Sequence, residues 1–476
     1  MIARHPAINP DPTMHAIADD SLDALRKLLG PGGLRSDDVA GTLDPGITTG
    51  NLDAGVVAFP ATVEEMRDIV RLCSARGIPM VPQGGRTGLA GGAASSPGQL
   101  IVSTARLNRI LDLDPLAGTA VVEPGVTLGQ LQQAAAEHGL SVGIDLAARD
   151  SATIGGMVST NAGGIEAFRH GTTRQRVLGL QAVLPSGEVL DDLKRVTKAN
   201  EGYDIKQLLI GAEGTLGIIT AIALSLVPLQ PGQGTALVAC PGAAEAVALF
   251  RRLRNAPGPD LLAAEILWPD FARITAHGLG LDALVAFAPQ ESVFLLVEVA
   301  GDSAEQAAEH LEIHLAGAIE AGEAQDAVLA KNAEERRRMW LIREESWEAD
   351  KAWPHGFWYD VSVPQGALDG YARALFARAG ELDPAMKVFL FGHLGDGNMH
   401  LTVTTGREMP ELHDAVDAAV FAGLAECGGS FSAEHGIGLE KRAHLARRGD
   451  PAKLALMRTI KQALDPLGIM NPGKVI

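Results

Sequence analysis

Apolar residues recur at helical spacing in several segments, and capping residues precede two of them. Thr62 and Glu65 have the spacing of a capping box at the start of a helix over 62–77. Thr127 and Gln130 repeat this spacing before a second apolar stripe. The pattern therefore predicts two amphipathic helices with defined N-termini in the first third of the chain.

Strand-like runs alternate with these helices. Residues 177–190 form two apolar runs around Pro-Ser-Gly, which predicts a hairpin. Beyond "QPGQG" at 230–234, a plausible domain boundary, strands and helices alternate again. The expected elements of both halves are strands at 78–82, 213–228 and 292–300, helices at 303–321 and 331–350, and an amphipathic helix at 451–464. The chain is therefore expected to be α+β, with two main domains.

Composition narrows the function classes. The chain has 476 residues and a net charge of −18, and no Lys/Arg-rich stripe occurs, which argues against nucleic-acid binding. Cys73, Cys240 and Cys427 lie far apart and form neither a disulfide framework nor a cysteine metal site. No run of about 18 apolar residues and no apolar signal region occurs. We therefore expect a cytoplasmic protein without a membrane span.

Two histidines flank an Asp-Gly pair in "FGHLGDGNMH", residues 391–400. Asp-Gly is typical of a two-residue hairpin turn, and that turn would place His393 directly opposite His400. Opposed side chains project from one face about 5 Å apart, close enough to hold one metal ion. The alternative is a polar pair on a solvated hairpin. Glu434, in "SAEHGIG" at 432–438, is the candidate third ligand, and such an open set suits a catalytic metal.

Three glycine-rich loops occur in the first half of the chain. They are "PQGGRTGLAGG" at 82–92, "ATIGGMVSTNAGG" at 152–164 and "GAEGTLGIIT" at 211–220. Loops without Cβ atoms can bring backbone N–H groups against a phosphate. Neither of the two best-known phosphate-loop motifs is present.

In their order, these loops and the segments between them resemble the FAD-binding domain of the vanillyl-alcohol-oxidase-type flavoproteins, from about 50 to 228. The resemblance implies a two-subdomain FAD-binding domain, an α+β cap or substrate domain, and a C-terminal segment that returns to the FAD domain. We expect a loose arm over 1–20, the FAD domain over 21–230, the cap over 231–425 and the C-terminal segment over 426–476. Arg86 stands where some relatives carry a flavin-linking histidine, which implies non-covalent FAD. The implied cofactor-binding residues are Pro82, Gly84, Gly85, Arg86, Thr87, Gly88, Leu89, Pro124, Gly125, Gly155, Gly156, Thr160, Asn161, Gly163, Gly164, Glu213, Gly214, Gly217, Ile218 and Asn471.

The set "GHLGDGNMH", "AEHGIG" and "NPGKVI" resembles the D-2-hydroxyacid dehydrogenases of this fold. That resemblance implies a divalent metal, often zinc, on His393, His400 and Glu434. A metal lowers the pKa of a bound hydroxyl, and a base must then remove the proton. His435 is the candidate base if the chain turns at Gly436; the alternative is that it only orients Glu434.

Arg343 matches the family arginine that binds the substrate carboxylate, and a guanidinium suits that role. A surface arginine paired with Glu344 is the alternative. Trp347, Trp358 and Thr402 replace a threonine, a lysine and an asparagine that help hold D-2-hydroxyglutarate in relatives. If these residues line the pocket, the loss of the lysine favours D-lactate or an apolar D-2-hydroxyacid; the tryptophans could instead be core residues. D-2-hydroxyglutarate is the alternative substrate.

We therefore expect an FAD- and metal-dependent D-2-hydroxyacid dehydrogenase. Its electrons would pass to an external acceptor such as electron-transfer flavoprotein, a quinone or a cytochrome, and a homodimer is one expected assembly. Two other classes stay open. One is a zinc hydrolase that uses His393, His400, Glu434 and His435, which would leave the glycine-rich loops without a role. The other is a flavin-binding module without chemistry.

Overall fold

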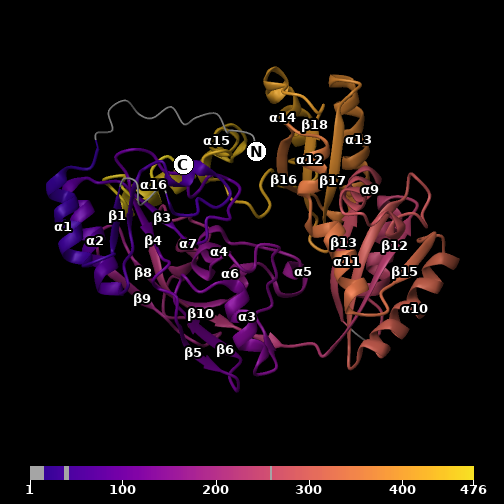
Figure 1. Ribbon diagram of the computed structural model, residues 1–476, viewed down its shortest axis with the longest axis horizontal. Coiled ribbons are helices and arrows are strands. Elements are labelled where there is room, and N and C mark those ends of the chain that lie inside the picture. The colour runs from indigo at the N-terminus through magenta and orange to yellow at the C-terminus, as the bar shows by residue number, and fades with distance from the viewer. Residues whose placement is uncertain (1–15, 37–41, 258–259) are drawn as a thin grey trace. The chain divides into compact units, whose positions relative to one another are not determined.

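The computed structural model describes residues 16–36, 42–257 and 260–476, which fall into two compact units (Figure 1). The first unit comprises Met1–Gly163, His170–Leu229 and Glu434–Ile476, and the second comprises Gly164–Arg169 and Gln230–Ala433. The C-terminal segment thus belongs with the N-terminal half of the chain. The mixed helix-and-sheet architecture expected from the sequence is confirmed.

The first unit contains two main sheets. The smaller has the order β1-β2-β4-β3, with β2, β4 and β3 parallel, and the larger is antiparallel with the order β5-β6-β10-β8-β9. Their strands are β1 (Leu34–Ser36), β2 (Val56–Ala58), β3 (Met80–Gln83), β4 (Leu100–Ser103), β5 (Ile110–Asp114), β6 (Thr119–Val122), β8 (Val177–Val183), β9 (Val189–Asp192) and β10 (Ile218–Ser225), and β7 (Leu140–Ser141) pairs with β11 (Val227–Pro228).

Helices surround these sheets and bury their apolar faces. They are α1 (Asp19–Leu29), α2 (Val63–Arg76), α3 (Leu128–Ala136), α4 (Ile154–Thr160), α6 (Thr173–Arg176), α7 (Lys206–Leu209), α15 (Arg442–Arg448) and α16 (Pro451–Leu464), with the 3-10 turn η2 (Thr49–Leu52). One core packs α1 and α2 on the smaller sheet, and a second packs α3 and α4 on the larger one. Each sheet of the first unit therefore has its own packed core, and the connecting loops extend from it.

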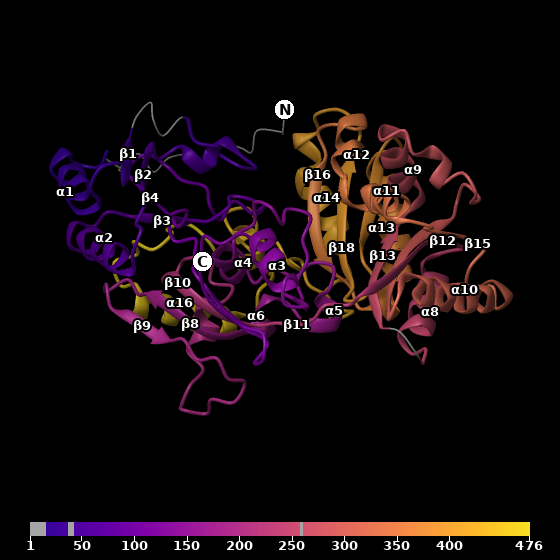
Figure 2. The same ribbon diagram turned by 60° about the horizontal axis from the view of Figure 1, so that its bottom comes forward.

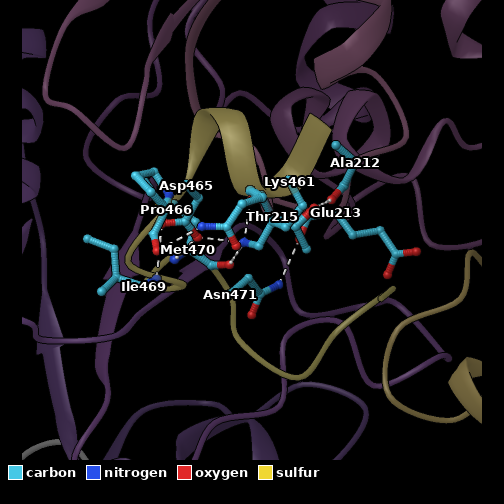
Figure 3. Close-up of polar contacts among 10 residues, drawn as sticks. Ala212, Glu213, Thr215, Lys461, Asp465, Pro466, Ile469, Met470 and Asn471 are labelled. Atoms are coloured by element: carbon cyan, nitrogen blue, oxygen red, sulfur yellow. Dashed lines mark hydrogen bonds and ion pairs between the residues drawn. The ribbon is translucent and has the colours of Figure 1, made fainter. Parts of the chain in front are cut away.

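The C-terminal segment is held to the first unit by backbone and ionic contacts. Met80 of β3 donates to the Ile469 carbonyl at 2.7 Å, and Asn471 N–H donates to the Met80 carbonyl at 2.8 Å. Figure 3 shows Lys461 Nζ, on α16, donating to Asp465 Oδ2 and to the Thr215 carbonyl at 2.6 and 2.8 Å. The buried Asp465 also accepts two backbone N–H groups, from residues 469 and 470. This network anchors α16 to the loop that precedes β10.

The second unit is built on one antiparallel seven-stranded sheet, with the order β15-β12-β14-β13-β17-β18-β16. The strands are β12 (Gly232–Cys240), β13 (Leu261–Leu267), β14 (Val293–Gly301), β15 (Asp326–Leu329), β16 (Phe357–Ser362), β17 (Lys387–His393) and β18 (Asn398–Thr404). Side chains alternate between its two faces, so each face has its own core.

Helices cover both faces of this sheet (Figure 2). One face packs on α8 (Ala243–Arg254), α10 (Ala304–Glu320), α13 (Leu368–Leu382) and α14 (His413–Phe421), and the other packs on α9 (Pro269–Gly278), α11 (Ala333–Glu344) and α12 (Trp347–Ala352). The remaining elements are the short helix α5 (Ala167–His170) and the 3-10 turns η3 (Asp282–Leu284), η4 (Gln365–Ala367) and η5 (Pro410–Leu412).

The element predictions are largely confirmed. The box at Thr127 and Gln130 is complete, whereas Glu65 reaches the N–H of Ala61 rather than that of Thr62. The helix expected over 331–350 is two helices, because it ends at Glu344 and α12 begins at Trp347. Of the arm expected over 1–20, residues 1–15 lie outside the described residues, and α1 begins at Asp19.

The described part of the chain contains no helix both long and apolar enough to cross a membrane. All three cysteines are free thiols.

Replacing Asp465 with alanine should destabilise the first unit. The change leaves the ammonium of Lys461, whose side chain is only 19% exposed, without its carboxylate. Breaking a buried pair from one side costs roughly 3–5 kcal/mol. Urea unfolding should show this loss, and the double variant Lys461→Met/Asp465→Ala should recover part of it. Arg458→Met, on the exposed side of α16, is the control. A loss below about 0.5 kcal/mol would show that the network is not structural.

Candidate active site

The three glycine-rich loops of the first unit line one cavity of about 330 Å³. They approach closely because two glycines leave room for a neighbouring backbone. A Cβ at Gly85 would lie 1.9 Å from the Ser151 carbonyl oxygen, and one at Gly155 would lie 2.4 Å from Pro124 Cβ. Any larger residue at either position would push the loops apart. The sequence therefore uses glycine here for loop-to-loop packing around the cavity.

Arg86 gives this cavity an unsatisfied donor. It lines the cavity, has a positive φ of 55°, and its Nε is buried with no hydrogen-bond partner among the described residues. Its Nη1 makes one long contact, 3.4 Å, with Gln83 Oε1. Burial lowers the pKa of Arg86, because it disfavours the charged form, and the Asp44 carboxylate opposes this shift. A half-buried guanidinium of this kind fits the diphosphate of FAD.

The other residues expected to bind the cofactor divide into two groups. Those that line the cavity are Pro82, Gly84, Gly85, Thr87, Gly88, Leu89, Pro124, Gly155, Gly156, Thr160, Glu213, Gly214, Gly217 and Ile218. Those that do not line it are Gly125, Asn161, Gly163, Gly164 and Asn471. Asn161 ends α4 in the left-handed conformation, and its Oδ1 accepts from Thr172 Oγ1 and from the Arg174 N–H.

Asn471 links the C-terminal segment to two of the glycine-rich loops through hydrogen bonds of its side chain. It is 1% exposed, and its Nδ2 donates to the Gly92 carbonyl at 3.0 Å and to the Glu213 carbonyl at 2.7 Å. Figure 3 shows the contact with Glu213. Asn471 thereby joins the first and third glycine-rich loops to the C-terminal segment.

Glu213 holds the loop that follows His435. Its Oε1 accepts the N–H of Ile437 at 2.7 Å, and its Oε2 accepts that of Gly438 at 2.9 Å. Burial raises the pKa of this carboxyl, and the two N–H donors oppose that rise. Gly436 has a φ of +81°, so the chain turns directly after His435. Glu434 and His435 both line the cavity.

In the second unit, His393 and His400 lie on one face of the sheet, but the register predicted from the sequence is wrong. His393 pairs with Asn398, and His400 pairs with Phe391, so the loop has four residues rather than two. The loop is lengthened because the Gly397 carbonyl accepts the N–H of Val363 on a neighbouring segment. The two histidines are diagonal neighbours, with ring centroids 5.4 Å apart.

Glu265 organises this face. It is fully buried on β13, opposite His393, and its two oxygens bind His393 Nδ1 at 2.8 Å and Arg343 Nε at 2.6 Å. Burial alone would raise the pKa of Glu265, but His393 and Arg343 outweigh burial and hold it below its ordinary value. Arg343 is 9% exposed and stacks over the Phe391 ring at 4.8 Å. The alternative of a surface arginine paired with Glu344 is therefore wrong.

A second buried carboxylate, Asp360, lies beside His400. They are register partners on β16 and β18, and His400 Nδ1 lies 3.8 Å from Asp360 Oδ1. Asp360 also accepts Asn398 Nδ2 at 2.9 Å and the N–H of Ala433 at 2.9 Å. Ala433 directly precedes Glu434 in the chain, so Asp360 fixes the backbone one residue before that proposed ligand.

Trp347, Trp358 and Thr402 gather around Asp350 of α12. Trp358 Nε1 donates to Asp350 Oδ1 at 3.0 Å, and Thr402 also hydrogen-bonds this carboxyl. The two indoles meet edge to face, with centroids 5.1 Å apart. Trp358 is 37% exposed and is therefore not a core residue. Burial raises the pKa of Asp350 to about 6, although both hydrogen bonds act to lower it.

Glu265, Asp350 and Asp360 were not predicted from the sequence as residues of the site. A single glutamate inside the apolar run "LLAAEIL" was a usable signal for Glu265, because an unpaired charge is rarely buried in a strand. Asp350 and Asp360 carried no comparable signal.

Replacing Glu213 with glutamine should loosen the loop after His435. Glutamine keeps the shape but presents a donor to one of the two N–H groups, at a cost of roughly 1–3 kcal/mol. Amide exchange at residues 437 and 438 should become about tenfold faster or more. Glu188→Gln, at an exposed position of the same unit, should leave this exchange unchanged. Unchanged protection in Glu213→Gln would contradict the anchoring role.

Comparison with known proteins agrees with this geometry. Residues 54–192 match the model of an FAD binding domain, and residues 230–475 match that of the FAD linked oxidases, C-terminal domain. The solved p-cresol methylhydroxylase is 18% identical, with a TM-score of 0.73, and the match covers 96% of this chain and 97% of that one. This likeness confirms the fold expected from the resemblance.

Two relatives are similar along most of their length. D-2-hydroxyglutarate dehydrogenase, mitochondrial, of Bos taurus is 37% identical over 97% of this chain and 84% of its own. D-2-hydroxyglutarate dehydrogenase of Xanthomonas citri pv. viticola is 36% identical over 88% of both chains. The chain therefore belongs to the family of FAD-linked oxidases and dehydrogenases, as a flavin-dependent oxidoreductase.

Proposed function

We propose that the protein oxidises a D-2-hydroxyacid to the 2-oxoacid. FAD supplies the hydride acceptor for this chemistry. The observation that carries the proposal is the sheet face of the second unit, where the buried Arg343 and two histidines share one surface. A guanidinium fixed by Glu265 and two imidazoles suit a carboxylate beside a hydroxyl group.

Each protein group has a distinct role in this proposal. The outer edge of the Arg343 guanidinium binds the substrate carboxylate, while its Nε stays with Glu265. His435 removes the hydroxyl proton, because its loop turns at Gly436 and is held by Glu213. Arg86 and the glycine-rich loops hold FAD without a covalent bond, since no histidine stands at that position.

We further propose a divalent metal on His393, His400 and Glu434, and zinc is the candidate because imidazole nitrogens and carboxylate oxygens are common zinc ligands. Such an ion, when bound, would lower the pKa of the substrate hydroxyl. Two observations support this ligand set. Glu265 accepts from His393 Nδ1, the arrangement found in many carboxylate–histidine–metal sites, and Arg343 Nη2 lies 3.4 Å from the other ring nitrogen, Nε2. Asp360 lies beside His400 and fixes the residue before Glu434.

The names of the relatives support D-2-hydroxyglutarate as substrate better than D-lactate, which the sequence favoured. A D-2-hydroxyacid without a second carboxylate is the other candidate, and Asp350 is the observation that favours it. The electron acceptor, the cytoplasmic location and the assembly stay predictions from the sequence.

Flavin reduction by a panel of D- and L-2-hydroxyacids tests the activity. The purified protein should be yellow, acid precipitation should release FAD, and only D-enantiomers should reduce the flavin and support an artificial electron acceptor. Arg343→Lys keeps a cation for Glu265 but cannot bind the substrate carboxylate in a bidentate way. The kcat/KM should therefore fall about 10- to 100-fold for every substrate. No reduction by any D-2-hydroxyacid would overturn the proposed activity.

Removing the metal ligands should abolish turnover but leave FAD bound. His393→Ala, His400→Ala and Glu434→Ala should each lose the ion, which elemental analysis measures, and chelation should reproduce the loss until a divalent ion is added back. His277→Ala, at an exposed histidine of α9, is the matched control. Full activity in a ligand variant that contains no metal would exclude this site.

A further inference from the structure

Asp350 occupies a defined position on the sheet face that carries His400. Trp358 and Thr402 are register partners, as are Asp360 and His400, and each pair lies on the same two strands. The two pairs are separated by two residues along each strand, so both project from one face, about 7 Å apart. The side chain of a hydroxyacid whose hydroxyl lies near His400 can therefore reach the group formed by Asp350, Trp358 and Thr402.

The hydrogen-bond donors to the Asp350 carboxylate are neutral groups. The donors are the indole N–H of Trp358 and the hydroxyl of Thr402. Two cations of the neighbouring helices have acidic partners of their own: Lys351 pairs with Glu348 at 2.6 Å, and Arg337 pairs with Glu334 at 2.7 Å. Each carboxylate oxygen has two lone pairs, so Asp350 can accept a further hydrogen bond from a substrate.

We propose that Asp350 determines substrate specificity by accepting a hydrogen bond from the substrate side chain and by disfavouring a second carboxylate. The inference rests on the proposed function and narrows it. An ionised distal carboxylate beside Asp350 would place two like charges together, which is unfavourable unless one is protonated. An amide or hydroxyl group can instead donate to Asp350, and the two indoles cover the apolar stem.

The ionisation of Asp350 supports this selection above neutral pH. Burial raises its pKa to about 6, so the group is charged at pH 8. On this proposal, the substrate preference of this chain differs from that of the relatives named for D-2-hydroxyglutarate. The proposal predicts the same reaction at C2 with a different preference for the end of the side chain.

A matched pair of substrates tests the inference at pH 8: D-2-hydroxyglutarate and its 5-carboxamide, D-2-hydroxyglutaramate. They differ only in the distal group. We expect the wild-type kcat/KM for the amide to exceed that for the diacid by about tenfold or more. Asp350→Asn, which keeps the shape and removes the charge, should reduce this ratio about tenfold, mainly by improving the diacid. Asp350→Ala should shift it in the same direction.

Asp369→Asn, at an ion-paired aspartate of α13, is the control and should leave the ratio unchanged. A wild-type preference for the diacid, or a ratio that Asp350→Asn does not change, would overturn the inference while turnover itself supports the proposed activity. Failure of both compounds and of D-lactate to reduce the flavin would overturn the proposed activity and, with it, this inference.

Discussion

The second unit depends on one fully buried carboxylate. Glu265 lies in the middle of a seven-stranded sheet, where a lone charge would cost several kcal/mol in lost hydration. Arg343 and His393 compensate it, and in doing so both side chains are fixed in place. The same contacts keep the arginine out of solvent and place its Nη2 3.4 Å from His393 Nε2. The contacts that stabilise the buried charge of Glu265 are thus the same contacts that position Arg343 and His393.

The first unit uses a carboxylate in a similar way. Glu213 is buried at a positive φ and accepts two consecutive backbone N–H groups from the loop after His435. Asn471 ties the backbone of Glu213 to the first glycine-rich loop. The segment that carries Glu434 and His435 is therefore fixed relative to the flavin cavity of its own unit. In each unit, a buried acid positions the side chains to which we assign chemistry.

The sequence predicted the architecture well because periodicity and turn residues act locally. The box at Thr127, the hairpin at 177–190 and the helix at 451–464 follow from such signals. The register of His393 and His400 did not, because the contact of Gly397 with Val363 lengthens the loop and is invisible locally. The apolar run around Glu265 indicates that this residue is buried, but its role could not be predicted, because its partners lie 78 and 128 residues away. Contacts between distant segments decide the site, whereas local chemistry decides the elements.

We propose that one reaction requires both the Glu265-centred face of the second unit and the flavin cavity of the first. Anaerobic stopped-flow spectroscopy of the FAD-loaded protein tests it most directly, with a D-2-hydroxyacid that carries protium or deuterium at C2. The account predicts that the wild-type flavin is reduced with a primary isotope effect. It also predicts that His393→Ala binds FAD normally but reduces it at least about a hundredfold more slowly. Reduction of the flavin at the wild-type rate in His393→Ala would contradict the account.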